Sequence, residues 1–427
     1  MTSRTLRALL VPGATLALMA ALAAPAPASA DPDSVPGTAG ATTVSGTPEP
    51  VRPAFYEPPA TLPATPGTIV RTEPATLFLD PLGLSDLGLS ATRVMYSSKD
   101  RLDRTNAVTG TVFEPRAPWL GVGARPLISY AVGTQGIADR CAPSRQMAES
   151  LTEYEQSLLK GYLVRGYAVA LTDYQGLGTP GTHTYVNRVP QARAVLDMAR
   201  AAIRRPGTSL TSATPVGLYG YSQGGGATAA AAELAGTYAP ELRIKGVVAG
   251  APPADLAAVG ANLEGSLYAE FLNFALLGLS AGYGIDLGSI LNDRGRAVAA
   301  ATEGHCVLDL AAAAFQRSET LTRDGRSFTA YLAEEPFASV VADSRIGRTR
   351  PSVPVLVAHS GLDDVIPYAV GRRLAKDWCA KGANVRLSTN VVPLHVGGVA
   401  PSSAESYAFF EARFAGLPQV NGCWAIW

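Results

Sequence analysis

Residues 219–228 read "YGYSQGGGAT", and this stretch decides the fold that we expect. The apolar run "TPVGLY" at 214–219 leads into it, and the helix-forming text "GGATAAAAELA" at 225–235 overlaps its end. A short apolar run followed by a glycine-rich turn and then an alanine-rich segment is typical of a buried strand that turns sharply into a helix. Ser222 stands at the turn itself.

The two glycines around Ser222 give this turn a chemical meaning. Gly220 and Gly224 flank the serine in the G-x-S-x-G spacing of a nucleophile elbow. The serine backbone in such an elbow is strained, and the strand and helix approach too closely for side chains. The alternative is a small residue in a tight turn, but the strand–turn–helix context favours a catalytic nucleophile. The backbone N–H of Gln223 would then donate to an oxyanion.

A serine hydroxyl is a weak nucleophile without a base, so an acid and then a histidine should follow it in the chain. The segment 353–368, "VPVLVAHSGLDDVIPY", reads as an apolar strand followed by a turn with Asp363 and Asp364. His395, in "VVPLHVGG", follows Asp363 by 395 − 363 = 32 positions. It is the only histidine after these aspartates. The order therefore predicts a Ser222, Asp363, His395 triad.

Only one of the two aspartates should bind the imidazole. In many hydrolases with this turn the acid lies four residues before a proline, and Pro367 is four residues after Asp363. We therefore expect Asp363 to be the acid and Asp364 to be a solvated or turn-capping carboxylate. The remaining histidines are expected to have structural roles, with His359 packing or hydrogen-bonding near its strand: His183, His305 and His359.

The composition excludes several classes of protein. The chain has 427 residues with 35 basic and 35 acidic side chains, so no field of one sign would attract nucleic acid. A hydrophobic fraction of 47% and a charged fraction of 16% are typical of a globular protein with a large core. We expect no nucleic-acid partner.

The N-terminal segment predicts export. Residues 1–30 place two arginines before an apolar stretch and end in Ala-Ser-Ala, the pattern of a cleaved signal peptide. The alternative is a membrane anchor, but prolines interrupt the stretch. Residues 31–53 are rich in Pro, Gly, Thr and Ser and read as a flexible leader. We expect a secreted, extracellular protein.

Four cysteines in an exported chain suggest two disulfides. They allow three pairings, and their positions alone do not choose among them. The sequence holds no C-x-x-C motif, so we expect no metal, and the triad chemistry needs no cofactor. The cysteines are Cys141, Cys306, Cys379 and Cys423.

Short apolar runs alternate with helix-like segments from Phe55 onward. This alternation predicts an α/β protein with a doubly wound, mostly parallel sheet. One long helix-like segment is 147–166. The rhythm breaks between about 255 and 340, where helix-like and Gly-rich text carries no clear buried strand. We expect a hydrolase core at 54–254 and 341–427 with a helical cap inserted at 255–340.

Several further stretches make a family resemblance specific. The chain resembles the secretory lipase family of actinobacteria and fungi, which includes lipase A of Candida antarctica, within the α/β-hydrolase superfamily. The likeness runs from about Phe55 to the C-terminus. It is carried by "FYEPPA", "PGTIVRTEP", "AVTGTVFEP", "SYAVGTQGIADRCAPS", "LTDYQGLGTPGTHTY", "YGYSQGG", "GLDDVIPY" and "LHVGG".

The resemblance implies an α/β-hydrolase fold with a cap, the triad given above, and disulfides joining Cys141 to Cys306 and Cys379 to Cys423. The chain departs from the family at one point, because Val132-Gly133-Thr134 stands where members often carry His-Gly-Thr. We therefore assign the second oxyanion donor to a backbone N–H near Thr134, or else Gln135.

These features together predict a secreted serine hydrolase that cleaves carboxylic esters with fatty acyl chains, of the triacylglycerol lipase type. The cap run "LYAEFLNFALLGL" is apolar on nearly every face and too short to span a bilayer, so we expect no stable membrane insertion. Its Phe271 and Phe274 are the predicted acyl-pocket residues, although plain core packing is the alternative. A short-chain esterase or acyltransferase would use the same triad, and a non-catalytic binding domain would require a broken one.

Overall fold

The structure is a computed structural model that describes residues 52–75, 88–149 and 152–426. The predicted signal peptide, 1–30, and nearly all of the predicted leader, 31–53, lie outside these ranges. Both assignments therefore stay predictions.

The described residues form one mixed sheet of nine strands in the order β1-β2-β3-β5-β4-β6-β7-β8-β9. The pairs from β1 to β3, and β3 with β5, are antiparallel. The pairs from β5 through β4 to β9 are parallel. The predicted mostly parallel α/β sheet is confirmed. The strands are β1 Ile69–Pro74, β2 Leu89–Lys99, β3 Thr105–Pro115, β4 Leu127–Ala131, β5 Ala168–Thr172, β6 Pro215–Tyr221, β7 Arg243–Gly250, β8 Val355–Ser360 and β9 Val385–Asn390.

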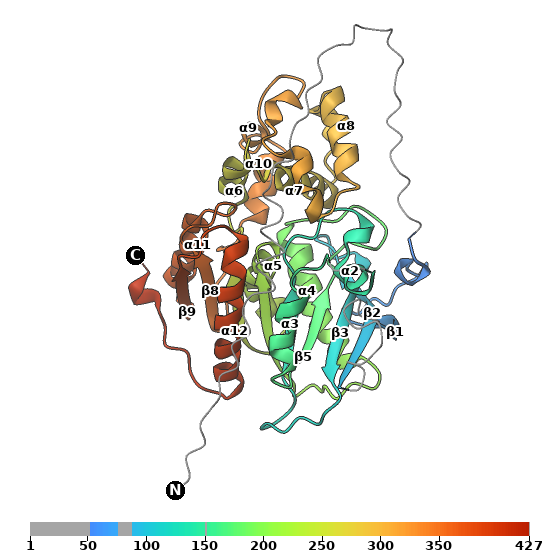
Figure 1. The fold of residues 1–427 in the computed structure, drawn as a ribbon, viewed down its shortest axis with the longest axis vertical. Helices are drawn as coiled ribbons and strands as arrows, with labels where there is room; N and C mark the ends of the chain where they lie inside the picture. The colour runs from blue at the N-terminus through green and yellow to red at the C-terminus, as the bar shows by residue number, and fades with distance from the viewer. Residues whose placement is uncertain (1–51, 76–87, 150–151, 427) are drawn as a thin grey trace, which may run out of the picture. The chain divides into compact units, whose positions relative to one another are not determined.

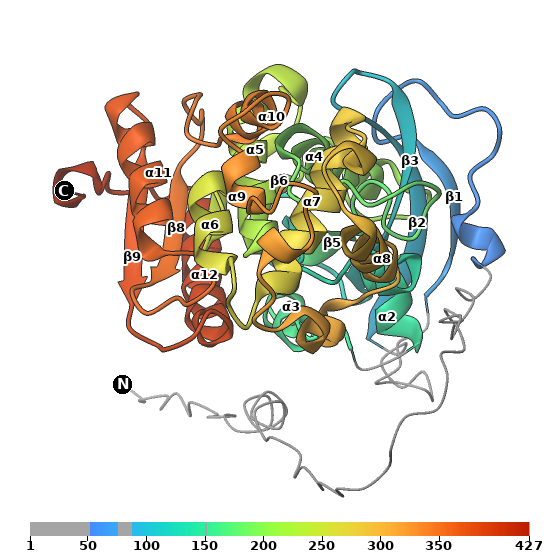
Figure 2. The same cartoon turned by 90° about the horizontal axis from the view of Figure 1, so that it is seen from above.

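Helices cover both faces of the parallel strands. Every residue of β4, β5 and β8 is buried, as expected for strands with helices on both sides. Helices α3 and α12 contact each other, as do α4 and α5, and Figure 2 shows these two pairs on opposite sides of the sheet. The helices outside the cap are α2 Pro143–Glu149, α3 Gln156–Leu163, α4 Arg188–Arg204, α5 Gln223–Tyr238, α11 Tyr368–Ala380 and α12 Val399–Phe414.

The single helix expected over 147–166 is wrong. The chain forms α2, which ends at Glu149, and α3, which begins at Gln156. Glu155, just before α3, is fully buried, and its carboxylate accepts hydrogen bonds from the Tyr130 hydroxyl and the Gly133 amide. These tertiary bonds to the end of β4 and the loop after it hold the residue that precedes α3, a constraint that local helix periodicity does not reveal.

Helices also fill the chain between β7 and β8, where no strand was expected. They are α6 Leu256–Leu263, α7 Ala269–Tyr283, α8 Asp293–Thr302, α9 Phe328–Tyr331 and α10 Phe337–Ser344. Figure 1 shows them gathered at one end of the sheet, and α10 contacts α4. We call residues 255–344 the cap. The division of the chain into core and cap domains stays a prediction.

The apolar run of the cap becomes α7. This helix ends at Tyr283, and the C-cap residue Gly284 adopts the left-handed conformation. One of its faces packs in a small apolar cluster with Tyr185 and Val186. Across the described ranges, every helix falls short of the length and apolarity needed to cross a membrane.

Candidate active site

Ser222 lies in a strained turn between β6 and α5. Its backbone has φ 59° and ψ −123°, which side-chain-bearing residues rarely adopt. A Cβ on Gly220 would clash with the carbonyl of Gly224, and a Cβ on Gly224 would clash with the carbonyl of Ala131. The two glycines are therefore needed for the close approach of strand and helix, as the elbow pattern indicates. The Ser222 amide donates to the carbonyl of Gly250 at 2.9 Å.

The structure brings the three predicted triad residues together. The Ser222 Oγ lies 2.8 Å from the Nε2 of His395, and the Nδ1 of His395 lies 2.7 Å from the Oδ2 of Asp363. With its proton on Nδ1, the imidazole donates to the carboxylate and accepts from the serine hydroxyl. His395 is 6% exposed, which shields these hydrogen bonds from water. The arrangement can pass the hydroxyl proton to the imidazole.

The Asp363 carboxylate is held ionised from several sides. Burial would raise its pKa, but hydrogen bonds from His359 and His395 lower the pKa well below its ordinary value. Its second oxygen accepts from the amides of Val365 and Ile366 at 3.0 and 2.8 Å. The Asp363 carboxylate therefore stays ionised while it accepts the hydrogen bond from the His395 imidazole.

His359 is a partner of the acid that sequence reasoning placed only near its strand. Its Nε2 lies 2.9 Å from the carbonyl of Ile366 and 3.3 Å from the Oδ2 of Asp363, and the ring is fully buried. Its position four residues before Asp363 in the sequence was the available signal.

Asp364 is not the solvated or turn-capping carboxylate that we expected. Its Oδ1 accepts from the backbone amide of His395 at 2.7 Å, and its Oδ2 accepts from the hydroxyl of Tyr268 at 2.8 Å. Both donors come from segments distant in the chain, so the turn sequence alone could not reveal them.

The loop after β4 lies beside the serine turn, as the predicted oxyanion site requires. Val132 and Thr134 are buried, and the amide of Gly133 is already used, because it donates to the Oε1 of Glu155 at 2.6 Å. In the described part of the chain, the amides of Thr134, Gln135 and Gln223 donate to no other protein group. These three amides remain the candidate oxyanion donors, and Thr134 and Gln135 stay open alternatives.

The side chain of Gln223 is fixed by His183. The Nε2 of His183 lies 3.0 Å from the Nε2 of Gln223, and its Nδ1 lies 2.9 Å from the carbonyl of Gln175. The ring therefore donates from Nδ1 to the carbonyl and accepts from the amide of Gln223 with Nε2. Burial lowers the pKa of His183 to about 4, which keeps this acceptor neutral. His183 thus has the structural role that we expected, and it acts on Gln223, the residue that follows Ser222.

An apolar cavity opens at Ser222. The space within it that a water-sized molecule can occupy is ≈ 60 Å³. Tyr185, Ser222 and Gln223 supply its polar side chains, and the rest of the lining is apolar. Much of that lining comes from the cap: Leu256, Val259 and Leu263 of α6, and Phe271, Leu272 and Leu276 of α7.

The two phenylalanines that were predicted to line the acyl pocket occupy different environments. Phe271 lines the cavity. Phe274 does not, because it is 0% exposed and packs edge-on against Tyr185 with ring centroids 6.1 Å apart. The pocket assignment of Phe274 is therefore wrong, and plain core packing describes it. Helical periodicity cannot tell the two apart on a helix that is apolar on nearly every face.

Two disulfides have the pairing that the family resemblance implies. Cys141 joins Cys306, which ties the segment after β4 to the cap, and the carbonyl of neighbouring His305 accepts from the amide of Ile137. The imidazole of His305 lies 2.6 Å from Glu270 of α7, so this histidine also has a structural role.

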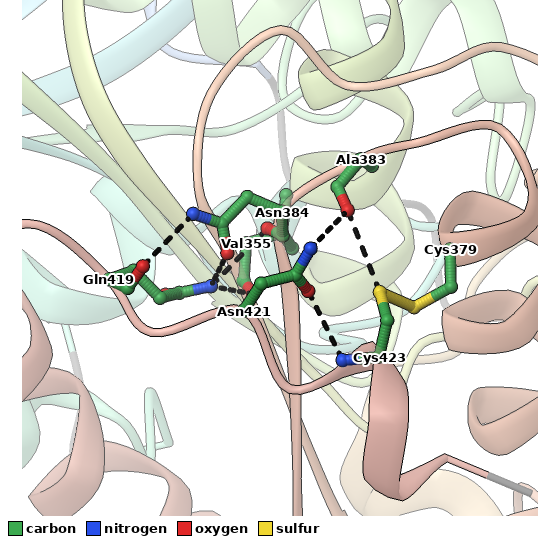
Figure 3. Close-up of a disulfide and its surroundings, with 7 residues drawn as sticks. All are labelled: Val355, Cys379, Ala383, Asn384, Gln419, Asn421 and Cys423. Carbon is green, nitrogen blue, oxygen red and sulfur yellow. Dashed lines mark hydrogen bonds between the residues drawn. A yellow bond between two sulfur atoms is a disulfide. The ribbon is translucent and has the colours of Figure 1, made fainter.

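The second disulfide fixes the C-terminal segment to the core. Cys379 of α11 joins Cys423, and Asn384, Gln419 and Asn421 form hydrogen bonds around the bridge, as Figure 3 shows. No group of His, Cys, Asp and Glu side chains in the described ranges is arranged to hold a metal ion.

Comparison with known proteins identifies the family. The statistical model of the family described as secretory lipase matches residues 143–422, well over half of the 427-residue chain. The chain belongs to the secretory lipase family. Membership confirms the resemblance found in the sequence motifs, and it makes the protein a lipase-type carboxylic ester hydrolase.

Relatives of this secretory lipase occur in bacteria and fungi. A Mycobacterium tuberculosis protein named a probable inactive lipase is 30% identical over 387 residues, which cover 86% of this chain and 83% of the relative. Lipase 10 of Candida albicans is 27% identical over 395 residues, with 88% and 83% covered. A secreted triacylglycerol lipase of Malassezia furfur is 27% identical over 318 residues, with 69% and 80% covered.

Solved structures confirm the α/β-hydrolase fold. Candida antarctica lipase A in its closed state superposes with a TM-score of 0.77 at 24% identity, covering 88% of this chain and 89% of that one. A Legionella pneumophila protein whose structure is described as that of a putative hydrolase superposes with a TM-score of 0.69 at 19% identity, covering 82% of this chain and 100% of that one. These similarities establish the fold of the secretory lipase.

Proposed function

We propose that this protein is a secreted serine hydrolase that cleaves carboxylic esters of fatty acids through an acyl-serine intermediate. The observation that carries the proposal is the continuous chain of hydrogen bonds from Asp363 through His395 to Ser222, which ends at an apolar cavity. A nucleophile, its base and the group that orients the base are the parts that acyl transfer requires.

Acylation begins when the Ser222 Oγ attacks the ester carbonyl and its proton passes to the Nε2 of His395. The negative Asp363 stabilises the imidazolium that forms. The amide of Gln223, with that of Thr134 or Gln135, donates to the carbonyl oxygen as it becomes an oxyanion. The C–O bond to the alcohol then breaks, and the imidazolium gives its proton to the departing alkoxide, which leaves as the free alcohol.

Deacylation repeats these steps with water. His395 takes a proton from a water molecule, whose oxygen attacks the acyl carbon. The Ser222 Oγ leaves with the proton returned by the imidazolium, and the fatty acid is released. Apart from the ester and water, the groups used in both halves of this proposed reaction belong to the chain.

The cavity supports an acyl chain as the bound part of the substrate. Its lining offers almost no hydrogen-bonding partner beyond the residues at the serine, so a peptide or sugar would lose its hydrogen bonds with water there. An alkyl chain gains up to about 0.8 kcal/mol for each methylene that it buries. Export is proposed from the sequence of residues 1–30 and agrees with the secreted relatives.

The proposal is tested with p-nitrophenyl esters from acetate to laurate and with a fluorophosphonate probe. Because one relative is named a probable inactive lipase, wild-type turnover is measured first. We expect kcat/KM to rise from acetate to octanoate or longer, and the probe to label the peptide that contains Ser222. A maximum at acetate would indicate a short-chain esterase, and product transfer to added alcohol in preference to water would indicate an acyltransferase.

A further inference from the structure

Asp364 links the loop that carries His395 to the cap. One of its oxygens accepts the backbone amide of His395 at 2.7 Å, and the other accepts the hydroxyl of Tyr268 in the cap at 2.8 Å. Asp363, its neighbour in the chain, holds the imidazole of the same histidine. The two adjacent carboxylates thus fix the backbone and the side chain of His395 separately.

The loop that carries His395 needs such support. Leu394, the residue before it, has φ 67°, a left-handed conformation that is unfavourable for a residue with a side chain. The carbonyl of His395 accepts from the hydroxyl of Tyr221 at 2.7 Å. The hydrogen bond from the His395 amide to Asp364 and the hydrogen bond from Tyr221 to the His395 carbonyl therefore fix the backbone on both sides of this histidine, although the preceding residue is strained. Loss of either would let the backbone relax.

The other side of Asp364 belongs to the cap. Asn262 in α6 donates to the backbone carbonyls of Asp364 and Val365 at 2.9 and 3.0 Å, so a second cap residue grips the same turn. The ring of Tyr268 stacks on Phe271 with centroids 6.2 Å apart and planes 7° apart. Phe271 lines the apolar cavity. A continuous path of contacts therefore runs from the cavity wall through Tyr268 and Asp364 to the backbone of His395.

Charge supports this path as well. Burial and the neighbouring Asp364 raise the pKa of Tyr268 above its ordinary value, so its hydroxyl keeps the proton that it donates. A hydrogen bond from a neutral donor to a carboxylate is stronger than one between two neutral groups. Tyr268 therefore remains a hydrogen-bond donor to the Asp364 carboxylate.

We propose that Asp364 is a positioning residue that couples the seating of the cap to the alignment of His395. When the cap is seated, Tyr268 holds the carboxylate that fixes the His395 backbone. When the cap moves away from the turn, this carboxylate loses its second partner and the imidazole loses alignment with Ser222. The inference rests on the proposed function, because it takes His395 to be the base.

The test compares Asp364→Ala, Asp364→Asn, Tyr268→Phe and the double variant Asp364→Ala/Tyr268→Phe on p-nitrophenyl octanoate. Since misplacement of a catalytic group by about 1 Å can cost up to ~100-fold in rate, we expect Asp364→Ala to lose about 10- to 100-fold in kcat with KM nearly unchanged. Asp364→Asn keeps an acceptor for the His395 amide and should restore most of the rate. Tyr268→Phe should lose less, and the double variant should be no slower than Asp364→Ala.

Tyr283→Phe is the matched control. It removes the same kind of bond, from a tyrosine hydroxyl to Asp343 at 2.7 Å, at the far end of α7 from Tyr268. We expect this variant to keep the wild-type kcat. A comparable kcat loss in Tyr283→Phe would mean that any loosening of α7 has this effect, and it would overturn the proposal.

Further outcomes would also overturn it. One is an Asp364→Ala variant that unfolds more easily but keeps the wild-type kcat. Others are an unchanged kcat in Tyr268→Phe, or losses that multiply in the double variant, because residues on one path are not independent. Ser222→Ala measured in parallel separates the two proposals: if that variant stays active, the proposed function fails whatever the Asp364 variants do.

Discussion

The Oγ of Ser222 lies 2.8 Å from the Nε2 of His395, although the two residues are 173 positions apart in the chain. The contact forms because Ser222 follows β6, Asp363 follows β8 and His395 follows β9, and these strands are parallel. The carboxyl ends of parallel strands meet at one edge of a sheet, where the connecting loops gather. The sheet topology therefore assembles the site, and its variants should show which loop residue has which role.

Asp363 and His359 should differ sharply in their effects on turnover. We expect Asp363→Asn to lower kcat by about 10⁴-fold, because an amide holds the imidazole in the wrong tautomer. His359 lies 3.3 Å from the same carboxylate oxygen, and its closer partner is the carbonyl of Ile366 at 2.9 Å. His359→Gln should therefore cost less than about 10-fold. Steady-state kinetics on one ester decide the ranking, and the reverse order would make His359 the principal partner of the acid.

His183 should make the protein less stable in acid. Its pKa falls from 6.5 to about 4 on burial, so the unfolded chain binds the proton more readily than the folded one. The contribution of the neutral His183 to the free energy of unfolding is complete above pH 6.5 and is lost as the pH falls toward 4. The shift in its pKa corresponds to a loss of about 3 kcal/mol. Urea unfolding at pH 7 and pH 4.5 measures it.

The control for this prediction is His183→Gln, which can accept from Gln223 and donate to the carbonyl of Gln175 without titrating. Buried acids such as Glu153 and Glu155 also titrate, but they do so in both proteins, so the difference between the two isolates His183. Equal pH dependence in wild type and variant would show that this histidine is already charged or exposed when folded.

Phe271 and Phe274 should separate selectivity from stability. Phe271→Ala removes part of the apolar cavity wall, so a long acyl chain would lose contacts there. The value of kcat/KM should therefore rise less steeply from acetate to octanoate than in the wild type. Phe274→Ala leaves a hole in a fully buried cluster and should cost about 3–5 kcal/mol in the free energy of unfolding. An ester series and urea titrations on both variants provide the measurements. A flattened series in Phe274→Ala alone would restore Phe274 to the pocket.

The disulfide between Cys141 and Cys306 should stabilise the protein through the long loop that it closes. The two cysteines are 165 residues apart, and closure of such a loop accounts for up to about 5 kcal/mol. Cys141→Ser/Cys306→Ser should lower the free energy of unfolding by up to that amount. The comparison is Cys379→Ser/Cys423→Ser, which removes a disulfide between cysteines only 44 positions apart. Peptide mapping without reduction that joined Cys141 to Cys379 or Cys423 would contradict the pairing.

The parts of the site that could be predicted are those that local sequence determines. The elbow at Ser222 needs only a strand, two glycines and a helix, and all of these lie within residues 214–235. The order of the acid and the histidine follows from the fold once the elbow is recognised. The central strands were readable because parallel strands buried on both faces are continuous apolar runs.

The parts that were missed depend on how distant segments pack. Asp364 was expected to be solvated or to cap its turn, because the turn sequence carries no sign of Tyr268, which lies 96 positions earlier. Phe274 and Phe271 are three residues apart on one helix, and the packing of an apolar cluster that includes Tyr185 decides which ring is covered. The break before α3 likewise depends on Glu155 meeting the loop after β4. Such contacts follow from the tertiary structure and leave no periodic signal in the sequence.

The most direct test of the proposed mechanism is the turnover of Ser222→Ala on p-nitrophenyl octanoate, measured on protein whose folding matches the wild type by circular dichroism. If Ser222 is the nucleophile, we predict that kcat falls by about 10⁶-fold, as loss of a triad serine does in other hydrolases. A variant that keeps a tenth or more of the wild-type kcat would contradict the acyl-serine mechanism and the roles given to His395 and Asp363 with it.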